Sequence, residues 1–276
     1  MLLTLFCKSL AYFKNFATEP RHQSSGRIQG FREVYWLILI VRIDINDHDL
    51  CHLIQLLPFL EQETQLQVSR LQALDDKKRT LLGNYIAKDF IARCTQQHIE
   101  NIHFTTNIYG KKIVQKHSIS FNISHSGKWV MIALSTNESI GIDVEKIDII
   151  NIEEVTRFFN AIEQRYLKEL TGKEAQHAFY RIWTAKESFL KCIGKGLSQS
   201  LDTFIVPLQP SSQPQVIEDR SISNIKLQVY SFQIDSEHFC SVCTKNFPSS
   251  IDMITLSKDF SVLRNEQLSS YEKRGK

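Results

Sequence analysis

Two acidic residues, two positions apart, are the first feature of this 276-residue chain that could carry chemistry. Asp143 and Glu145 lie in the segment GIDVEKI (141–147), whose alternating apolar residues predict a β-strand. Side chains two apart on a strand point to the same face, so the two carboxylates should repel each other unless a cation lies between them. Carboxylate oxygens suit Mg²⁺. The pattern also fits the solvated edge of a strand, which is the simpler interpretation of this motif alone.

A second charged pair lies in the segment WTAKESFLK (183–191), where apolar residues at helical spacing predict a helix. Glu187 and Lys191 are four positions apart and therefore share one face of that helix. One interpretation is a surface ion pair worth only ~0.3–0.5 kcal/mol. The other is a third carboxylate for the cation, with a fixed positive charge that meets a phosphate.

Two further segments offer groups that can bind phosphate. Ser124 and His125 follow a predicted strand in FNISHSGKWV (121–130), and a hydroxyl, an imidazole and backbone N–H groups in such a turn can contact phosphate or ribose. A single histidine is more often structural. Arg79 ends the charged cluster DDKKR (75–79), which is most simply a solvated helix face from which Arg79 could reach a phosphate.

The elements that must position these residues fall into two halves. Helical periodicity over 60–94 is followed by strand patterns, and helical patterns over 151–193, including an amphipathic helix at 157–170, are followed by strands again. This order predicts two α+β subdomains joined near 136–140, with a ligand between them. We predict an N-terminal extension outside the fold at 1–30, a first subdomain at 31–138, a second subdomain at 139–264 and a polar tail at 265–276.

The composition narrows the class of protein. The net charge of +3 is too small to indicate nucleic acid, but it is compatible with an acidic protein partner or a polyanionic ligand. No apolar run reaches the ~20 residues that cross a bilayer. The six cysteines form no disulfide framework, and Cys240 and Cys243 should point to opposite faces of a strand. We therefore predict a cytoplasmic protein with neither a nucleic-acid partner nor a membrane.

Taken together, in this order and spacing, the motifs resemble the Sfp-type 4′-phosphopantetheinyl transferases of the holo-acyl-carrier-protein synthase superfamily. The resemblance runs from about residue 33 to about residue 260 and is most specific in the second half. The segments that carry it are RTLLG (79–83), YGK (109–111), FNISHSGKWV (121–130), GIDVEKI (141–147), FYRIWTAKESFLKCIGKGLS (179–198) and LDTFIV (201–206).

Two places depart from the family pattern. The YGK motif is usually followed by proline, whereas this chain has Lys112. The helix before Arg79 carries basic residues in the best-known members, whereas Thr64 and Gln67 stand near those positions here. These departures concern secondary contacts to phosphate and leave the motifs of the reaction intact.

The resemblance implies a pseudo-two-fold pair of α+β subdomains with coenzyme A in the cleft between them. It implies that Asp143, Glu145 and Glu187 are the ligands of Mg²⁺. The resemblance also implies that Lys191 contacts the region of the transferred phosphate. The proton of the acceptor serine goes to a carboxylate, with Glu187 our first choice, or to a water held by the metal. The residues implied for the adenosine 3′-phosphate side of coenzyme A are Arg79, Thr80, Lys111, Ser124 and His125.

The implied reaction transfers 4′-phosphopantetheine from coenzyme A to a serine of an apo carrier protein, which yields holo carrier protein and 3′,5′-ADP. We expect a monomer, and carriers of fatty-acid, polyketide, peptide-synthetase or aminoadipate-reductase pathways all fit. One alternative is a metal-dependent nucleotide pyrophosphate hydrolase, although the sequence offers it no dedicated water-activating group. The other is a non-catalytic module that binds coenzyme A or a carrier, which would not need three acids.

Overall fold

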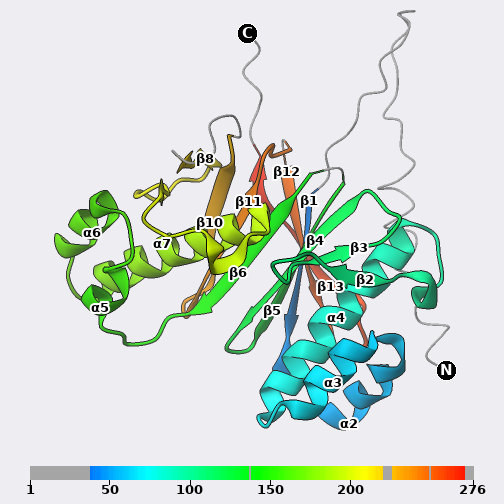
Figure 1. Cartoon of the computed structure of the whole chain (residues 1–276). Coiled ribbons are helices and arrows are strands. Elements are labelled where there is room, and N and C mark those ends of the chain that lie inside the picture. The colour runs from blue at the N-terminus through cyan, green and yellow to red at the C-terminus, as the bar shows by residue number, and fades with distance from the viewer. Residues whose placement is uncertain (1–37, 137, 220–225, 249, 271–276) are drawn as a thin grey trace, which may run out of the picture.

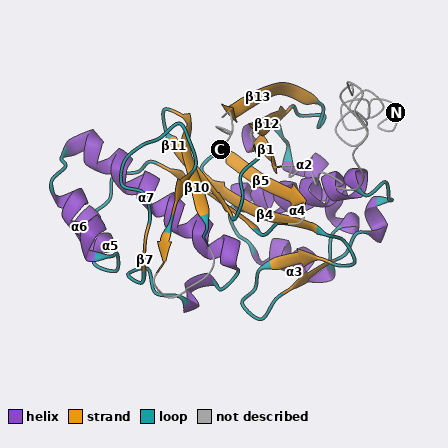
Figure 2. Cartoon of the chain, turned by 90° about the horizontal axis from the view of Figure 1, so that it is seen from above, coloured by secondary structure: helices purple, strands orange, loops and turns teal. Residues whose placement is uncertain are grey.

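The computed structural model describes residues 38–136, 138–219, 226–248 and 250–270. Two sheets face each other at the centre of this part of the chain, and a long helix covers the outer face of each sheet (Figure 1). Viewed from above, helices again lie on both sides of the strands (Figure 2). The predicted extension at residues 1–30 falls outside the described residues.

The first sheet has five strands and is covered by a helix of 21 residues, α4 (Leu74–Cys94). Its strands, in spatial order, are β13 (Val262–Ser270), β12 (Ser250–Leu256), β1 (Ile38–Asp44), β5 (Trp129–Thr136) and β4 (Ile119–Ser126). β1 is buried on both faces, because Leu39 and Val41 pack under α4 while Ile38 and Ile40 face the other sheet. This accounts for the continuous apolar run over its first four residues, 38–41.

The second sheet has four strands and is covered by α7 (Gly172–Ile193), which ends at Gly194 in a left-handed conformation. Its strands, in spatial order, are β6 (Ile140–Lys146), β11 (His238–Thr244), β10 (Gln228–Asp235) and β8 (Gln215–Val216). Cys240 lies in the core between the sheets and Cys243 in the core under α7. The two thiols therefore point to opposite faces of β11, as predicted.

Shorter elements connect the two layers. The helices and 3-10 turns are η1 (Ile45–Asp47), α2 (Leu50–Leu53), η2 (Ile54–Phe59), α3 (Gln62–Arg70), η3 (Ile99–Asn101), α5 (Ile152–Thr156), α6 (Ala161–Lys168) and η4 (Gly196–Ser198). The remaining strands are β2 (Phe104–Thr106), β3 (Lys112–Val114), β7 (Phe204–Ile205) and β9 (Glu218–Asp219). None of the helices in the described ranges has the length and apolar character that crossing a bilayer requires.

The strand order adds a feature that the predicted division into 31–138 and 139–264 does not contain. β12 and β13 return to the first sheet, where β12 lies parallel to β1 with Leu39 opposite Asp252. The physical reason is that β1 is an apolar strand with only one edge covered by β5, so its other edge needs a partner. β13 also continues to Ser270, so the predicted tail at 265–276 is a strand over its first six residues.

The helix-rich region 60–94 is divided between α3 and α4. Gly83 lies inside α4 at a close contact, because an added Cβ would lie 2.8 Å from Ile123 Cγ2. The predicted helix at 157–170 begins only at Ala161. Asn160 caps it, since its side chain accepts from Ile162 N at 3.1 Å and its own N–H donates to Glu163 Oε2 at 3.1 Å.

Candidate active site

Asp143 and Glu145 lie on the face of β6 that meets α7, while Ile142 and Val144 fill the core between the sheets. This alternation confirms the predicted strand. Asp143 is 2% exposed, and its Oδ1 accepts from Ser124 Oγ at 3.0 Å and from Lys191 Nζ at 2.5 Å. The deeper acid is therefore fixed by a hydroxyl and an ammonium group.

Glu145 is held by neighbours that the sequence motifs did not single out. Its Oε2 accepts from Ser126 Oγ at 2.9 Å, and Trp183 Nε1 lies 3.5 Å from its Oε1. Ser126 could have been found from the alternation of polar residues along 122–126, because Asn122, Ser124 and Ser126 occupy the same face of β4.

α7 approaches β6 closely enough to bring its own charged residues to the acids. An added Cβ at Gly141 would lie 2.0 Å from Ser188 O, so only glycine permits this contact between helix and strand. Lys191 thereby reaches Asp143, and it also donates to Ser124 Oγ at 3.0 Å. Glu187 lies one turn earlier on the same face of α7.

The three acids perturb one another. Burial is the largest cause that raises the pKa of Asp143, of Glu145 and of Glu187. The charge of Asp143 raises the pKa values of the two glutamates further, while Lys191 opposes the rise at all three. Loss of hydration and mutual repulsion both disfavour ionised acids here, and a bound cation would relieve both.

The chemistry of these side chains fits a hard cation. Asp143 Oδ2 is buried and has no hydrogen-bond partner in the described ranges, so one carboxylate oxygen is left for a ligand. Across those same residues, however, no three His, Cys, Asp or Glu side chains converge as closely as metal ligands do. The donor set is present, and Lys191 currently provides the positive charge at Asp143.

A row of side chains on β4 joins the two sheets beside these acids. Backbone N–H groups of β6 donate to Asn122 Oδ1 at 2.8 Å, to Ser124 Oγ at 3.3 Å and to Ser126 Oγ at 3.0 Å. The donors are Ile142, Val144 and Lys146. The serines that orient the acids therefore also fix the spacing between the sheets.

Arg79, Thr80 and His125 lie around the turn between β4 and β5. Arg79 donates to Gly127 O at 2.5 Å and to Asp76 Oδ1 at 2.7 Å. His125 is exposed at the end of β4, and loss of hydration lowers its pKa, as do the positive charges of Arg79 and Lys191. Thr80 is buried on α4 at 7% exposure.

Lys111 is placed differently from the other predicted phosphate ligands. Its Nζ donates to Ile140 O at 3.0 Å, to Cys192 O at 3.1 Å and to Ser139 Oγ at 3.3 Å. These oxygens lie at the beginning of β6 and the end of α7, so the ammonium group caps that helix. The structure gathers Ser124, Asp143, Glu145, Glu187 and Lys191 around β6, with Arg79 and His125 beside them, and leaves Lys111 at the other end of the strand.

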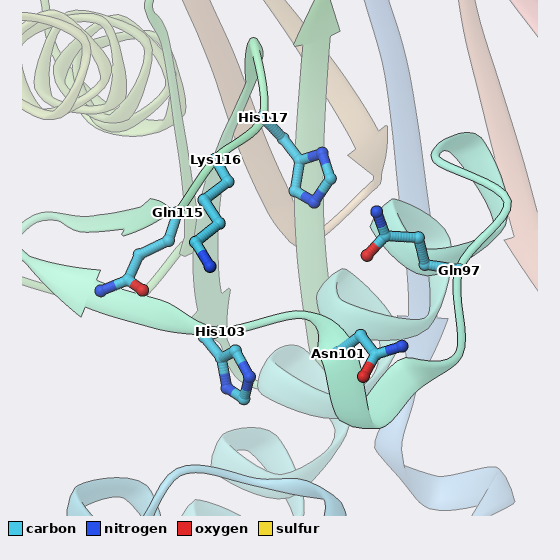
Figure 3. A pocket seen from close by; sticks show the side chains of 6 residues that line it. All are labelled: Gln97, Asn101, His103, Gln115, Lys116 and His117. Atoms are coloured by element: carbon cyan, nitrogen blue, oxygen red, sulfur yellow. The ribbon is translucent and has the colours of Figure 1, made fainter.

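A separate pocket opens beside the β2–β3 hairpin (Figure 3). None of the predicted site residues contributes to its wall. The side chains that line it are Gln97, Asn101, His103, Gln115, Lys116 and His117.

Comparison with known proteins identifies the family. The profile of the 4′-phosphopantetheinyl transferase superfamily matches residues 139–243, and the profile of the 4′-phosphopantetheinyl transferase N-terminal region matches residues 47–137. The 4′-phosphopantetheinyl transferase Sfp of Bacillus subtilis is 36% identical over 200 residues, which cover 71% of this chain and 88% of that protein. The chain belongs to the 4′-phosphopantetheinyl transferase superfamily.

More distant members of the superfamily match as well. The 4′-phosphopantetheinyl transferase gsp of Aneurinibacillus migulanus is 31% identical over 199 residues, covering 72% of this chain and 81% of its own. The rat L-aminoadipate-semialdehyde dehydrogenase-phosphopantetheinyl transferase is 25% identical over 207 residues, covering 67% of each chain. The resemblance predicted from the motifs is thus confirmed, as are the α+β class and the assignment as a transferase of the phosphopantetheinyl group.

Proposed function

We propose that this phosphopantetheinyl transferase moves 4′-phosphopantetheine from coenzyme A to a serine of an apo carrier protein and releases 3′,5′-ADP. The observation that carries the proposal is the contact between β6 and α7. There the buried Asp143 keeps one unpartnered oxygen while its other oxygen bonds Lys191 and Ser124. Neighbouring carboxylates can bind a cation, and the lysine beside them can bind the phosphate group that this cation accompanies.

Asp143, Glu145 and Glu187 would hold Mg²⁺ in this proposal. Bound there, Mg²⁺ supplies neutralisation of the charge on the pyrophosphate of coenzyme A. Ser124 and Ser126 keep the carboxylates of Asp143 and Glu145 turned toward the cleft by donating to one oxygen of each. Membership of the family supports the presence of a metal ion. The buried Asp143 Oδ2, which has no hydrogen-bond partner in the described ranges, supports the assignment of these residues as its ligands.

The chain's own side chains accept the proton of the carrier's serine and place a positive charge beside the phosphate. The carrier's serine hydroxyl attacks the phosphorus that bears the pantetheine arm, the new P–O bond forms, and the bond to 3′,5′-ADP breaks in line. Glu187 accepts the hydroxyl proton, and the raised pKa of its carboxyl makes it a stronger base than an ordinary glutamate. Lys191 supplies a fixed positive charge beside the phosphate.

Arg79 and His125 would contact the adenosine 3′-phosphate side of coenzyme A. They lie at the end of β4 and on the facing turn of α4, and the charge of Arg79 acts directly on His125. Thr80, Ser124 and Lys111 stay predictions of the family resemblance, since Thr80 and Ser124 are buried and Lys111 is engaged with three oxygens. The monomeric state and the cytoplasmic location also stay predictions.

The surface that follows β6 supports docking of an acidic carrier. Ile149, Phe158 and Ile162 are exposed by 94%, 57% and 46%. The guanidinium of Arg157 lies over the Phe158 ring at 4.6 Å, and Arg165 and Lys168 end α6. Exposed apolar side chains and basic residues in the segment 157–168 fit a partner that presents an acidic helix.

Mass spectrometry of apo carrier proteins incubated with this protein, coenzyme A and Mg²⁺ tests the proposal. We expect one phosphopantetheine on the carrier's serine and release of 3′,5′-ADP only when carrier is present. Release without carrier would indicate the hydrolase alternative. Binding of coenzyme A without any transfer would indicate a binding module.

A further inference from the structure

A buried histidine of the second sheet lies against the turn that joins β4 to β5 of the first sheet. His238 begins β11 and is 1% exposed, and its Nδ1 lies 2.8 Å from Asp235 Oδ1. An ionised carboxylate only accepts hydrogen bonds, so the Nδ1 hydrogen is directed at Asp235. The motifs of the candidate site include neither residue, and the proposed transfer step uses neither of them.

The other ring nitrogen of His238 faces Gly127 in that turn. Gly127 has a φ of 54°, and an added Cβ would lie 2.5 Å from His238 Nε2. The backbone of the turn therefore packs directly on the imidazole, with no room for a larger residue. Nε2 is buried and has no hydrogen-bond partner among the described residues, so the ring supports the turn by packing.

Asp235 extends the contact to the next residues of the same turn. Its Oδ2 accepts from Trp129 Nε1 at 2.8 Å and lies 3.4 Å from Lys128 Nζ. Burial alone would raise the pKa of Asp235, but hydrogen bonds from Trp129, His238 and Glu237 N lower this pKa below its ordinary value. The carboxylate is therefore ionised at neutral pH, and it joins β10 of the second sheet to β5 of the first.

The turn that is held in this way connects the two groups assigned to coenzyme A. Gly127 O accepts from Arg79 on α4 at 2.5 Å, and His125 lies two residues before Gly127 at the end of β4. Both groups are thus attached to one short segment, residues 125–129, which rests on His238 and Asp235. Movement of that segment would displace both groups together.

The candidate metal ligand Asp143 is fixed by other bonds. It accepts from Ser124 and Lys191, and the same serine oxygen accepts from Val144 N at 3.3 Å. None of these bonds includes an atom of the histidine or its aspartate. A change at that pair should therefore affect the binding of coenzyme A more than the chemistry at Asp143.

We propose that Asp235 and His238 are positioning residues for coenzyme A. They hold residues 125–129 where Arg79 and His125 meet the nucleotide. His238 supports the turn from below, while Asp235 orients the imidazole and bonds the first residue of β5. The inference rests on the proposed function.

Calorimetric binding of coenzyme A to the full-length protein, together with transfer kinetics, tests the proposal. His238→Ala removes the support of the turn. We expect about a fivefold loss of affinity for coenzyme A, the size of one net hydrogen bond, with a raised KM for coenzyme A and little change in kcat. Asp235→Ala should act in the same direction. Asp235→Asn keeps one oxygen that can accept from Trp129 and should recover part of the affinity.

A double-mutant cycle tests the contact between the ring and the turn. Gly127→Ala places a methyl group against His238 Nε2 and should weaken the binding of coenzyme A. That clash is absent in a His238→Ala background, whereas the strain of the left-handed backbone is present in both backgrounds. The two losses of affinity should therefore be less than additive.

The matched control is Tyr230→Phe. It removes another hydrogen bond of β10, from Tyr230 Oη to Leu268 O of β13 at 3.0 Å, which does not involve the turn. We expect it to lower the temperature of unfolding without changing the affinity for coenzyme A. Thermal unfolding of every variant separates loss of binding from loss of fold, and Asp235→Asn gives the same test where an alanine variant does not fold.

Each outcome decides the question. Unchanged coenzyme A affinity in His238→Ala and Asp235→Ala, fully additive losses in the cycle, or an equal loss in Tyr230→Phe would overturn the proposal. Normal coenzyme A binding without transfer to any carrier would overturn the proposed function. The affinities of the variants for coenzyme A would then still decide the role of Asp235 and His238.

Discussion

Two lysines of α7, Lys186 and Lys191, each pair with a carboxylate of another element. The two pairs differ in whether all their hydrogen-bonding groups have partners. Lys186 and Glu163 have fully buried side chains 2.8 Å apart. Lys186 Nζ also donates to Leu201 O at 2.8 Å and to Phe204 O at 2.9 Å, so all three of its hydrogens are used. Both oxygens of Glu163 accept further backbone N–H groups, from Asn160 and from Val206.

The pair of Lys191 and Asp143 is incomplete by comparison. The lysine side chain is 29% exposed, and Asp143 Oδ2 has no partner in the described ranges. A complete pair has no donor or acceptor left for a ligand. The pair of Lys186 and Glu163 therefore has a structural role, which is to hold together α6, α7 and the segment 199–206. The incomplete pair keeps bonding capacity, in the buried Asp143 Oδ2 beside a partly exposed lysine. The comparison therefore separates a structural ion pair from a functional one on the same helix.

The largest effect should come from breaking the complete pair. Lys186→Met leaves Glu163 buried without its counter-charge, which should lower the free energy of unfolding by about 3–5 kcal/mol. Denaturant unfolding measures this. The double variant Lys186→Met/Glu163→Gln removes both charges and should recover part of the loss, because the amide oxygen of Gln can still accept a backbone N–H group where Glu163 does. A single variant as stable as the wild type would show that the pair does not hold α6 in place.

Breaking the incomplete pair should instead reduce activity and leave stability intact. Asp143→Ala should lower the rate of transfer on the order of 10²-fold or more, the size typical of a lost electrostatic group. Its unfolding free energy should stay close to that of the wild type, because the removed carboxylate is buried with an unpartnered oxygen. Steady-state transfer at saturating Mg²⁺ and thermal unfolding are the two measurements. Near-normal turnover would remove Asp143 from the site.

A moderate effect should appear in the pH dependence of coenzyme A binding. The positive charge of Lys191 contributes to the lowered pKa of His125, whereas Glu163 neutralises Lys186. A bound phosphate would raise the pKa of His125 again, so binding should take up a proton. Affinity for coenzyme A should therefore increase as the pH falls from about 7.5 toward the ordinary histidine value of about 6.5.

Calorimetry in buffers of different ionisation enthalpy measures that proton uptake. His125→Asn should abolish most of the uptake and weaken coenzyme A more than its 3′-dephospho form. Lys191→Gln should raise the pKa of the free His125 imidazole and so reduce the uptake at neutral pH. An uptake that survives in His125→Asn would assign the proton to another group.

The smallest effect should come from the surface that the complete pair supports. α6 begins at a cap that includes Glu163, so the exposed Arg165 and Lys168 are held in a fixed place. Reversing both to glutamate should raise the KM for the carrier several-fold and weaken its salt dependence, with no change in coenzyme A affinity. Kinetics at low and high ionic strength measure this, and an unchanged carrier KM at low salt would exclude the docking role.

The faces on which the candidate site residues lie were easier to predict from the sequence than the arrangement of the strands. The two-residue spacing of Asp143 and Glu145 fixes a shared face on any strand, and the four-residue spacing of Glu187 and Lys191 does the same on a helix. Such local geometry needs no knowledge of the rest of the chain. The end of α7 at Gly194 was predictable for the same reason, because a helix commonly ends at a glycine, which adopts the left-handed backbone conformation without strain.

The features that the sequence did not reveal depend on contacts between distant segments. Periodicity marks β12 as a strand but does not tell that its partner is β1. The capping of α6 by Asn160 and Glu163 interrupts an amphipathic pattern that otherwise looks continuous. The side chains of the neighbouring Lys111 and Lys112 reach different subdomains, since Lys111 bonds the ends of β6 and α7 whereas Lys112 bonds Thr64 of α3. Spacing along the chain contains no such information.

The seam between β4 and β6 has a consequence for how the site can be observed. The amide hydrogens of Ile142, Val144 and Lys146 are protected by side-chain oxygens of β4 and by no backbone carbonyl across that seam. Their exchange with solvent deuterium is therefore governed by the rotamers of three polar side chains, two of which also orient the acids. Exchange at Val144 thus reports the state of the Ser124 hydroxyl in the absence of any substrate.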